Sequence, residues 1–161
     1  MPKIIEAVPN FSEGRRTDVI EEIVSAVRQV QGGGRVLDLS SDADHNRSVL
    51  TLAGDGEQVR RSVIALFQAA LPRIDLRRHQ GEHPRLGAVD VVPFVPVSGA
   101  TMSECVELAR SVGEELGKLF SLPVYLYEEA ASAEHPRNLA EIRKGEFEGL
   151  DEKMRDPRWT P

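Results

Sequence analysis

The chain has 161 residues and a formal net charge of −6, with 40% hydrophobic and 29% charged residues. This composition is typical of one globular domain and excludes a chain that is disordered throughout. Because the balance is acidic and no run of 18 residues lacks charge, we expect neither a general nucleic-acid partner nor a membrane-spanning helix.

The first half of the chain predicts three strands and two helices, in the order strand, helix, strand, strand, helix. Residues 3–8 predict a strand that ends at Pro9, and residues 10–14 predict a turn-rich loop. From Thr17 the apolar side chains recur at helical spacing until the three glycines at 32–34 end the helix. Two further strands and a second amphipathic helix are predicted over residues 35–39, 47–53 and 56–71.

The second half predicts a fourth strand over residues 88–95, whose end is weakened by Pro93 because proline cannot donate to a sheet ladder. Thr101 and Glu104 have the spacing of a capping box, so a third helix is expected to begin there and run to about residue 120. A fifth strand is predicted over residues 123–127, and the polar remainder predicts helical stretches at 139–144 and 147–154.

This order predicts an α+β fold with a ferredoxin-like βαββαβ core. The last helix and strand would extend the core into a mixed sheet with helices on one face. We expect the other face to include Val49, Thr51, Val89 and Val91, with the register unassigned. Such an apolar face is expected to dock against another subunit, another domain or a ligand.

Cys105 is the single cysteine, and it lies on the apolar side of the third predicted helix. A place in the core is expected, rather than a role as a nucleophile. One cysteine cannot form an internal disulfide, and the start of the chain is too polar for a signal peptide, so a cytoplasmic location is expected.

The densest cluster of chemically active side chains is residues 77–88, RRHQGEHPRLGA, in the loop before the fourth strand. Histidine can exchange a proton near neutral pH, and the arginine fork binds carboxylates. Loops often carry function, although an ordinary solvated basic loop would have the same composition. The cluster supplies four candidate site residues: His79, Glu82, His83 and Arg85.

His79 and His83 are four residues apart, the spacing of two metal ligands on one helix face. Gly81 and Pro84 make a helix there unfavourable, so the two rings are not expected to share a helix face. Glu82, Asp90 or His45 would have to supply a third ligand. We therefore expect no metal.

Two other polar loops are weaker candidates. Residues 40–47, SSDADHNR, alternate acidic positions but lack the glycine and closing glutamate of a calcium-binding EF-hand loop. Residues 10–14, NFSEG, are typical of a helix entry. Both patterns also fit ordinary loops. Asn10 and Arg47 can converge, because Arg47 begins the strand that pairs back along the sheet.

Five segments together resemble a known family: VPNFSEG, DHNRSV, RHQGEHPRLGAVDVVPF, PVYLYEEA and IRKGEFEGL. In this order and spacing they resemble the amino-terminal subdomain of glutamate formiminotransferase over nearly the whole chain. The resemblance implies one such subdomain at residues 1–161, and transfer of a formimino group from N-formimino-L-glutamate to N5 of tetrahydrofolate in histidine breakdown. The histidine of the family's EHPR motif is catalytic, which implies that role for His83.

The resemblance also implies tetrahydrofolate as the acceptor substrate and no metal. The residues expected to bind substrate or folate are Asn10, Asn46, Arg47, His79, Glu82 and Arg85. Which of Asp38, Asp42 and Asp44 orients the catalytic histidine stays open. Family enzymes have a second, carboxy-terminal subdomain, and the sequence stops about where that half would begin. We therefore expect either a fragment of a longer protein or a half-protein, as a homo-oligomer or docked to such a subdomain.

Three alternatives remain open at the level of sequence. The chain could be a non-catalytic half-domain that binds folate or serves in assembly. It could transfer a formyl rather than a formimino group, since the two donors differ by one heteroatom. It could also be a metal-dependent hydrolase built on His79 and His83.

Overall fold

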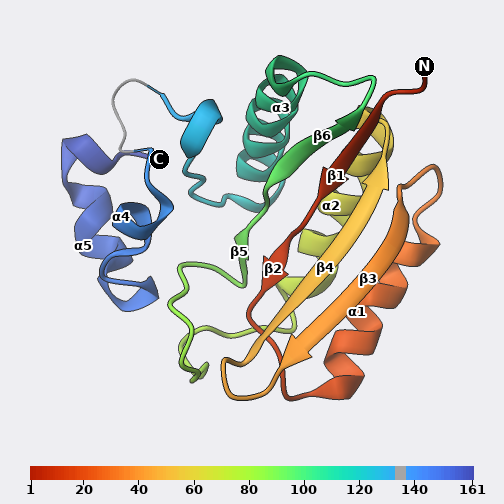
Figure 1. Cartoon of the computed structure of the whole chain (residues 1–161). Helices are drawn as coiled ribbons and strands as arrows, with labels where there is room; N and C mark the ends of the chain where they lie inside the picture. Colours follow the sequence, from red (N-terminus) through yellow and green to blue (C-terminus); the bar gives the residue numbers. More distant parts are fainter. Residues whose placement is uncertain (133–136) are drawn as a thin grey trace.

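The computed structural model describes residues 1–132 and 137–161, and six strands in it form one sheet with three long helices on one face (Figure 1). The sheet order is β5-β2-β4-β1-β6, and β3 pairs with the other edge of β4. The strands are β1 (Ile4–Ala7), β2 (Asn10–Phe11), β3 (Arg35–Asp42), β4 (Arg47–Gly54), β5 (Val89–Val91) and β6 (Phe94–Ser98). The long helices are α1 (Thr17–Gln29), α2 (Gly56–Ala70) and α3 (Met102–Phe120).

Prolines interrupt two neighbouring strands at the same level of the sheet. Pro9 separates β1 from β2, and Pro93 separates β5 from β6, because proline has no N–H to donate to a ladder. The backbone N–H of Val8 donates to the carbonyl oxygen of Pro93 at 3.2 Å, which bridges the two breaks. The predicted strand at 88–95 is therefore two strands, and the predicted loop at 10–14 begins with β2.

With each interrupted pair counted as one strand, the order is the ferredoxin-like one, and the predicted α+β class is confirmed. Every strand pairing in the described part of the chain is antiparallel. The expectation of a mixed sheet, with parallel and antiparallel pairs, is therefore wrong. The predicted helices are confirmed, including the capping box of Thr101 and Glu104 that begins α3. None of the described helices is long and apolar enough to cross a membrane.

The core lies between the sheet and the helices, as the alternating burial of the β4 side chains shows. The side chains of this strand alternate between buried and partly exposed, so Leu50 and Leu52 face the helices while Val49 and Thr51 face away from them. Val89 is paired with Phe11 on the helix side and is buried, so its expected place on the open face is wrong. On the open face, Val95 and Val97 are 44% and 57% exposed.

The strand predicted at residues 123–127, after α3, does not form, because no other strand pairs with this segment in the described residues. Residues 123–127 instead lie along α3, where Val124 approaches Gly113. Short helical turns follow at η1 (Glu128–Ala130), α4 (Leu139–Arg143), η2 (Phe147–Gly149), α5 (Leu150–Arg155) and η3 (Pro157–Trp159). This C-terminal segment borders a cavity of about 950 Å³ between itself and the core, and polar contacts connect it to the loop before β5.

Candidate functional site

Three loops meet at one end of the sheet: residues 12–16, the β3–β4 turn and the loop before β5. Two glycines allow their close approach. A Cβ at Gly81 would lie 2.3 Å from the carbonyl oxygen of His45, and one at Gly14 would lie 2.2 Å from that of Asp42. The N–H of Glu82 donates to the carbonyl oxygen of Asp44 at 3.2 Å. The sequence thus brings its three polar clusters together.

Asn46 joins all three loops. Its backbone is left-handed, with φ at 51°, and the residue is 8% exposed. Its Oδ1 accepts from the N–H of Gly14 at 2.8 Å, and its Nδ2 donates to the carbonyl oxygen of Gln80 at 3.0 Å. Both ends of the side-chain amide are thus engaged within the protein, and the residue acts as scaffold in this structure.

His79 is also held at both ring nitrogens. Its Nε2 lies 2.9 Å from the carbonyl oxygen of Asn46, and its Nδ1 accepts from Nε of Arg85 at 3.0 Å. Because arginine can only donate, Nδ1 must be the acceptor and Nε2 carries the hydrogen. This arrangement fixes the ring and its tautomer.

Arg85 is buried, and its guanidinium faces carboxylates of the C-terminal segment. Nη1 and Nη2 donate to the two oxygens of Glu148 at 2.9 and 2.7 Å, and Nη1 lies 3.4 Å from Glu146. The hydrogen bonds from Arg85 lower the pKa of the Glu148 carboxyl to about 2, and Glu148 in turn raises the pKa of Arg85. The expected substrate contact of Arg85 would therefore require an exchange of partners.

His83 lies in the small pocket where these loops meet, lined also by Ser12, His45, Asn46, Arg47, His79, Arg85 and Asp90. Burial is the largest cause that lowers the pKa of His83, and the positive charges of Arg47 and Arg143 lower it further. The hydrogen bond to the backbone of Pro84 and the charge of Asp90 act in the opposite direction but do not reverse the shift. The imidazole is therefore neutral at neutral pH and can accept a proton.

Arg47 is the other cation beside His83, at the first residue of β4. Its guanidinium makes no hydrogen bond and no ion pair within residues 1–132 and 137–161. An arginine beside a neutral base, with its fork open, is suited to hold a carboxylate of a bound molecule.

Asn10 and Glu82 are the remaining expected residues, and neither lines this pocket. Asn10 donates from Nδ2 to the carbonyl oxygen of Val8 at 3.1 Å, and Glu82 is exposed. Asp42 lies 3.0 Å from Nδ1 of His45, whose ring centroid is 6.3 Å from that of His83. The structure shows no group of three or more possible ligands for a metal among the residues it describes.

Two residues that act on His83 were not expected in that role, although Asp90 was considered as a metal ligand. Asp90 in β5 and Arg143 in α4 form an ion pair, with Nη2 of Arg143 2.5 Å from Oδ2 of Asp90. The carboxylate whose charge reaches His83 is thus Asp90, outside the three aspartates considered. An acidic residue within the apolar run AVDVV was the available signal.

Comparison with known proteins decides the family. Residues 4–161 match the family described as the formiminotransferase domain, N-terminal subdomain. The chain belongs to this family. The formiminotransferase resemblance drawn from the sequence is thereby confirmed.

Relatives of this N-terminal subdomain occur in bacteria, archaea and animals. The chain is 45% identical over 161 residues to the glutamate formimidoyltransferase of Streptococcus pyogenes, and covers 54% of it. Over 160 residues it is 42% identical to that of Thermoplasma acidophilum, covering 98% of this chain and 52% of the relative. It is 45% identical to the formimidoyltransferase-cyclodeaminase of Sus scrofa and covers 30% of it. The chain thus spans about half or less of these relatives.

Proposed function

We propose that this subdomain takes part in transferring the formimino group of N-formimino-L-glutamate to N5 of tetrahydrofolate, with His83 as the catalytic base. The observation that carries the proposal is that the imidazole of His83 and the open fork of Arg47 line the same pocket, where burial lowers the pKa of His83. Relatives named glutamate formimidoyltransferase support this donor.

In the proposed reaction the N5 nitrogen attacks the formimino carbon and gives its proton to His83. The bond between that carbon and the glutamate nitrogen then breaks, and His83 returns the proton to the leaving nitrogen. One imidazole can serve both steps, and general acid–base catalysis of this kind contributes about 10²–10⁴-fold. Holding donor and acceptor side by side contributes further through proximity.

Arg47 is proposed to hold a carboxylate of formiminoglutamate or of the folate tail. Asn10, His79, Glu82 and Arg85 line or support the same end of the sheet. Asn46 and His79 hold the loops around the pocket together through hydrogen bonds to backbone groups.

The open sheet face is proposed to receive a carboxy-terminal subdomain or a second copy, with folate between the two walls. Val95 and Val97 contribute exposed apolar surface to this face. A cytoplasmic setting, expected from the single cysteine Cys105, is part of the proposal. Cys105 itself is 2% exposed in the core, and burial raises the pKa of its thiol.

The decisive experiment measures formimino transfer by the 161-residue chain with N-formimino-L-glutamate and tetrahydrofolate, beside its His83→Ala variant. We expect turnover that falls about 10²-fold or more in the variant, with the fold intact by circular dichroism. Folate binding without turnover would favour the non-catalytic half-domain. Turnover with N-formyl-L-glutamate alone would favour the formyl donor, and loss of turnover after chelation would favour the metal hydrolase.

A further inference from the structure

The C-terminal segment holds the loop that carries His83 at two points, and the first is Arg85. Besides the two-pronged pair with Glu148, the N–H of Arg85 donates to Oε1 of Glu146 at 3.3 Å. The N–H of Phe147 donates to the carbonyl oxygen of Arg85 at 3.0 Å. Side chain and backbone of one loop residue are thus both bound by residues 146–148.

The second point is Asp90 in β5, five residues after Arg85 in the chain. Its side chain is 4% exposed and accepts from Nε of Arg143 at 2.9 Å. The same carboxylate accepts from the backbone N–H of Leu86 at 2.5 Å. Arg143 therefore acts through Asp90 on Leu86, the residue next to Arg85. The loop that carries His83 is thus held by two ion pairs, of which Arg143–Asp90 is largely buried and Arg85–Glu148 joins a buried arginine to an exposed carboxylate.

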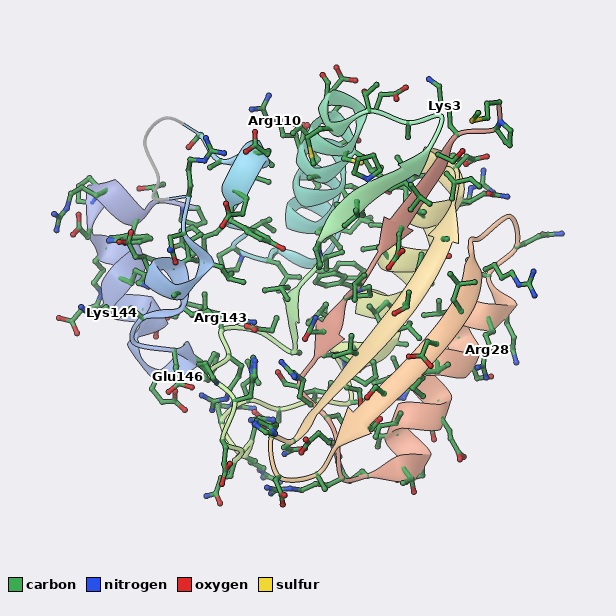
Figure 2. The ribbon with its side chains drawn as sticks, viewed as in Figure 1. Lys3, Arg28, Arg110, Arg143, Lys144 and Glu146 are labelled. Carbon is green, nitrogen blue, oxygen red and sulfur yellow. The ribbon has the colours of Figure 1, made fainter. Side chains whose placement is uncertain are left out.

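Unusual backbone geometry marks the turn that makes these contacts. Glu146 has φ 53° and ψ −164°, a region that residues with a side chain rarely occupy, and Gly145 before it has φ 92°. Such a conformation persists only where its surroundings determine it. Here it directs the carboxylate of Glu146 and the N–H of Phe147 at the same residue, Arg85. Figure 2 labels Arg143 and Glu146 at the two ends of this turn.

The charges around His83 come from several elements. Arg47 stands at the start of β4, the His45 ring in the β3–β4 turn, Asp90 in β5 and Arg143 in α4. Of the two cations that lower the pKa of His83, only Arg143 belongs to the C-terminal segment. That segment therefore contributes both to the place of the imidazole and to its proton affinity.

We propose that residues 143–148 are a positioning segment for His83, in which Glu148 holds Arg85 and Arg143 holds Asp90, so that the base faces Arg47 in one orientation. The role of His83 as the base rests on the proposed function, whereas the positioning itself does not. Arg143 and Glu148 act through other residues and are positioning residues rather than catalytic ones.

The first test is an NMR titration of the histidine rings in the 161-residue chain, with the His83 signal assigned by His83→Gln. Arg143→Gln removes a cation and leaves the Asp90 carboxylate without its partner, so both changes raise the pKa of His83 and should move its titration to higher pH. Arg143→Lys, which keeps the charge, should restore most of the wild-type value. Lys144→Gln is the matched control, because Lys144 is exposed on the same turn. An unchanged His83 titration in folded Arg143→Gln would overturn the proposal.

The second test uses Glu148→Gln, which keeps the shape of the side chain and removes its charge. Amide hydrogen exchange at Leu86 and Phe147 should speed up about tenfold or more, while exchange in α1 and α2 stays unchanged. Glu114→Gln is the control, since Glu114 is 68% exposed and Glu148 is 65% exposed, and each pairs with a cation. Equal amide exchange rates in the two variants would contradict the positioning role. A rate increase spread evenly over the chain would contradict it as well, because it would show a general loss of stability.

These readouts also separate the proposal from the proposed function. The titration and the exchange need no substrate, so they can succeed in a chain that shows no transfer. Conversely, transfer that depends on His83 while Arg143→Gln leaves the His83 titration unchanged would support the function and reject the positioning role.

Discussion

Arg85 donates from Nε to Nδ1 of His79 at 3.0 Å, so the one histidine of the loop that contacts an arginine cannot offer that nitrogen to a substrate. The other ring nitrogen of His79 lies 2.9 Å from the carbonyl oxygen of Asn46. His83, four residues further along, has neither contact and faces the pocket. The two histidines therefore have different roles: His79 holds loops together and His83 is available for proton transfer.

His79→Ala is expected to cost stability. The variant loses two hydrogen bonds and leaves Nε of the buried Arg85 without its acceptor, a loss of about 1–3 kcal/mol. Urea unfolding followed by circular dichroism measures it. His83→Ala serves as the comparison and should cost less, since His83 is only partly buried and its hydrogen bond reaches the backbone of the adjacent Pro84 rather than a second loop. Equal stabilities of His79→Ala and the wild type would contradict the scaffold role.

Gly81→Ala should disrupt the contact between the loop before β5 and the β3–β4 turn. The added Cβ would lie 2.3 Å from the carbonyl oxygen of His45 and 2.9 Å from Cβ of Asn46, so backbone must shift. Overpacking of this kind costs about 1–3 kcal/mol and should also displace His83. Gly56→Ala is the control, because nothing lies within 4 Å of its added Cβ. Equal midpoints of urea unfolding for the two variants would be the contrary result.

The pKa of His83 gives stability and rate a pH dependence of known sign. Because the folded pKa lies below the ordinary value of 6.5, the unfolded chain takes up the proton more readily. The stability contributed by neutral His83 is therefore present above about pH 6.5 and is lost as the pH falls through the folded value. Turnover that needs the neutral ring should rise with pH over the same interval and level off above it.

His83→Gln removes the titrating group and tests this sign. Unfolding free energies of the variant and the wild type should run parallel above about pH 7 and diverge at about pH 5, where the wild type loses more stability. Parallel curves over the whole range would mean that the pKa of His83 is not lowered.

Much of the fold follows from the sequence because its signals are local. Apolar periodicity and the capping box of Thr101 and Glu104 suffice to place the three long helices. The strand expected at 123–127 fails for a non-local reason, since an extended apolar segment becomes a strand only where another strand pairs with it. The break at Pro9 has a local cause, but β2 beyond it depends on pairing with β4 and β5.

For the candidate site, too, some residues can be predicted from local sequence and others cannot. The loop residues of the RHQGEHPR run can be recognised from composition, and the structure places His83 in the pocket. The partners of that loop cannot be read from spacing, because Arg85 and Glu148 are 63 positions apart, and Asp90 and Arg143 are 53 positions apart. Such pairs depend on how the C-terminal segment returns to the core. The free fork of Arg47 likewise becomes apparent only once the other arginines of the pocket are seen to have partners.

Arg47 is the last residue for which the structure gives a specific expectation. Its guanidinium has no partner in the described part of the chain, so Arg47→Ala should leave stability nearly unchanged while weakening substrate binding. Loss of one charged hydrogen bond costs about 1.5–3 kcal/mol, which corresponds to a rise in KM of about ten- to a hundred-fold. Arg47→Lys should recover little, because lysine lacks the two-pronged fork. Steady-state kinetics with each substrate varied in turn, beside urea unfolding, measures both effects.

Because Arg47 also lowers the pKa of His83, its removal should move the rising limb of the pH–rate profile to higher pH. A KM unchanged for both substrates would show that Arg47 acts on the base alone and holds no carboxylate.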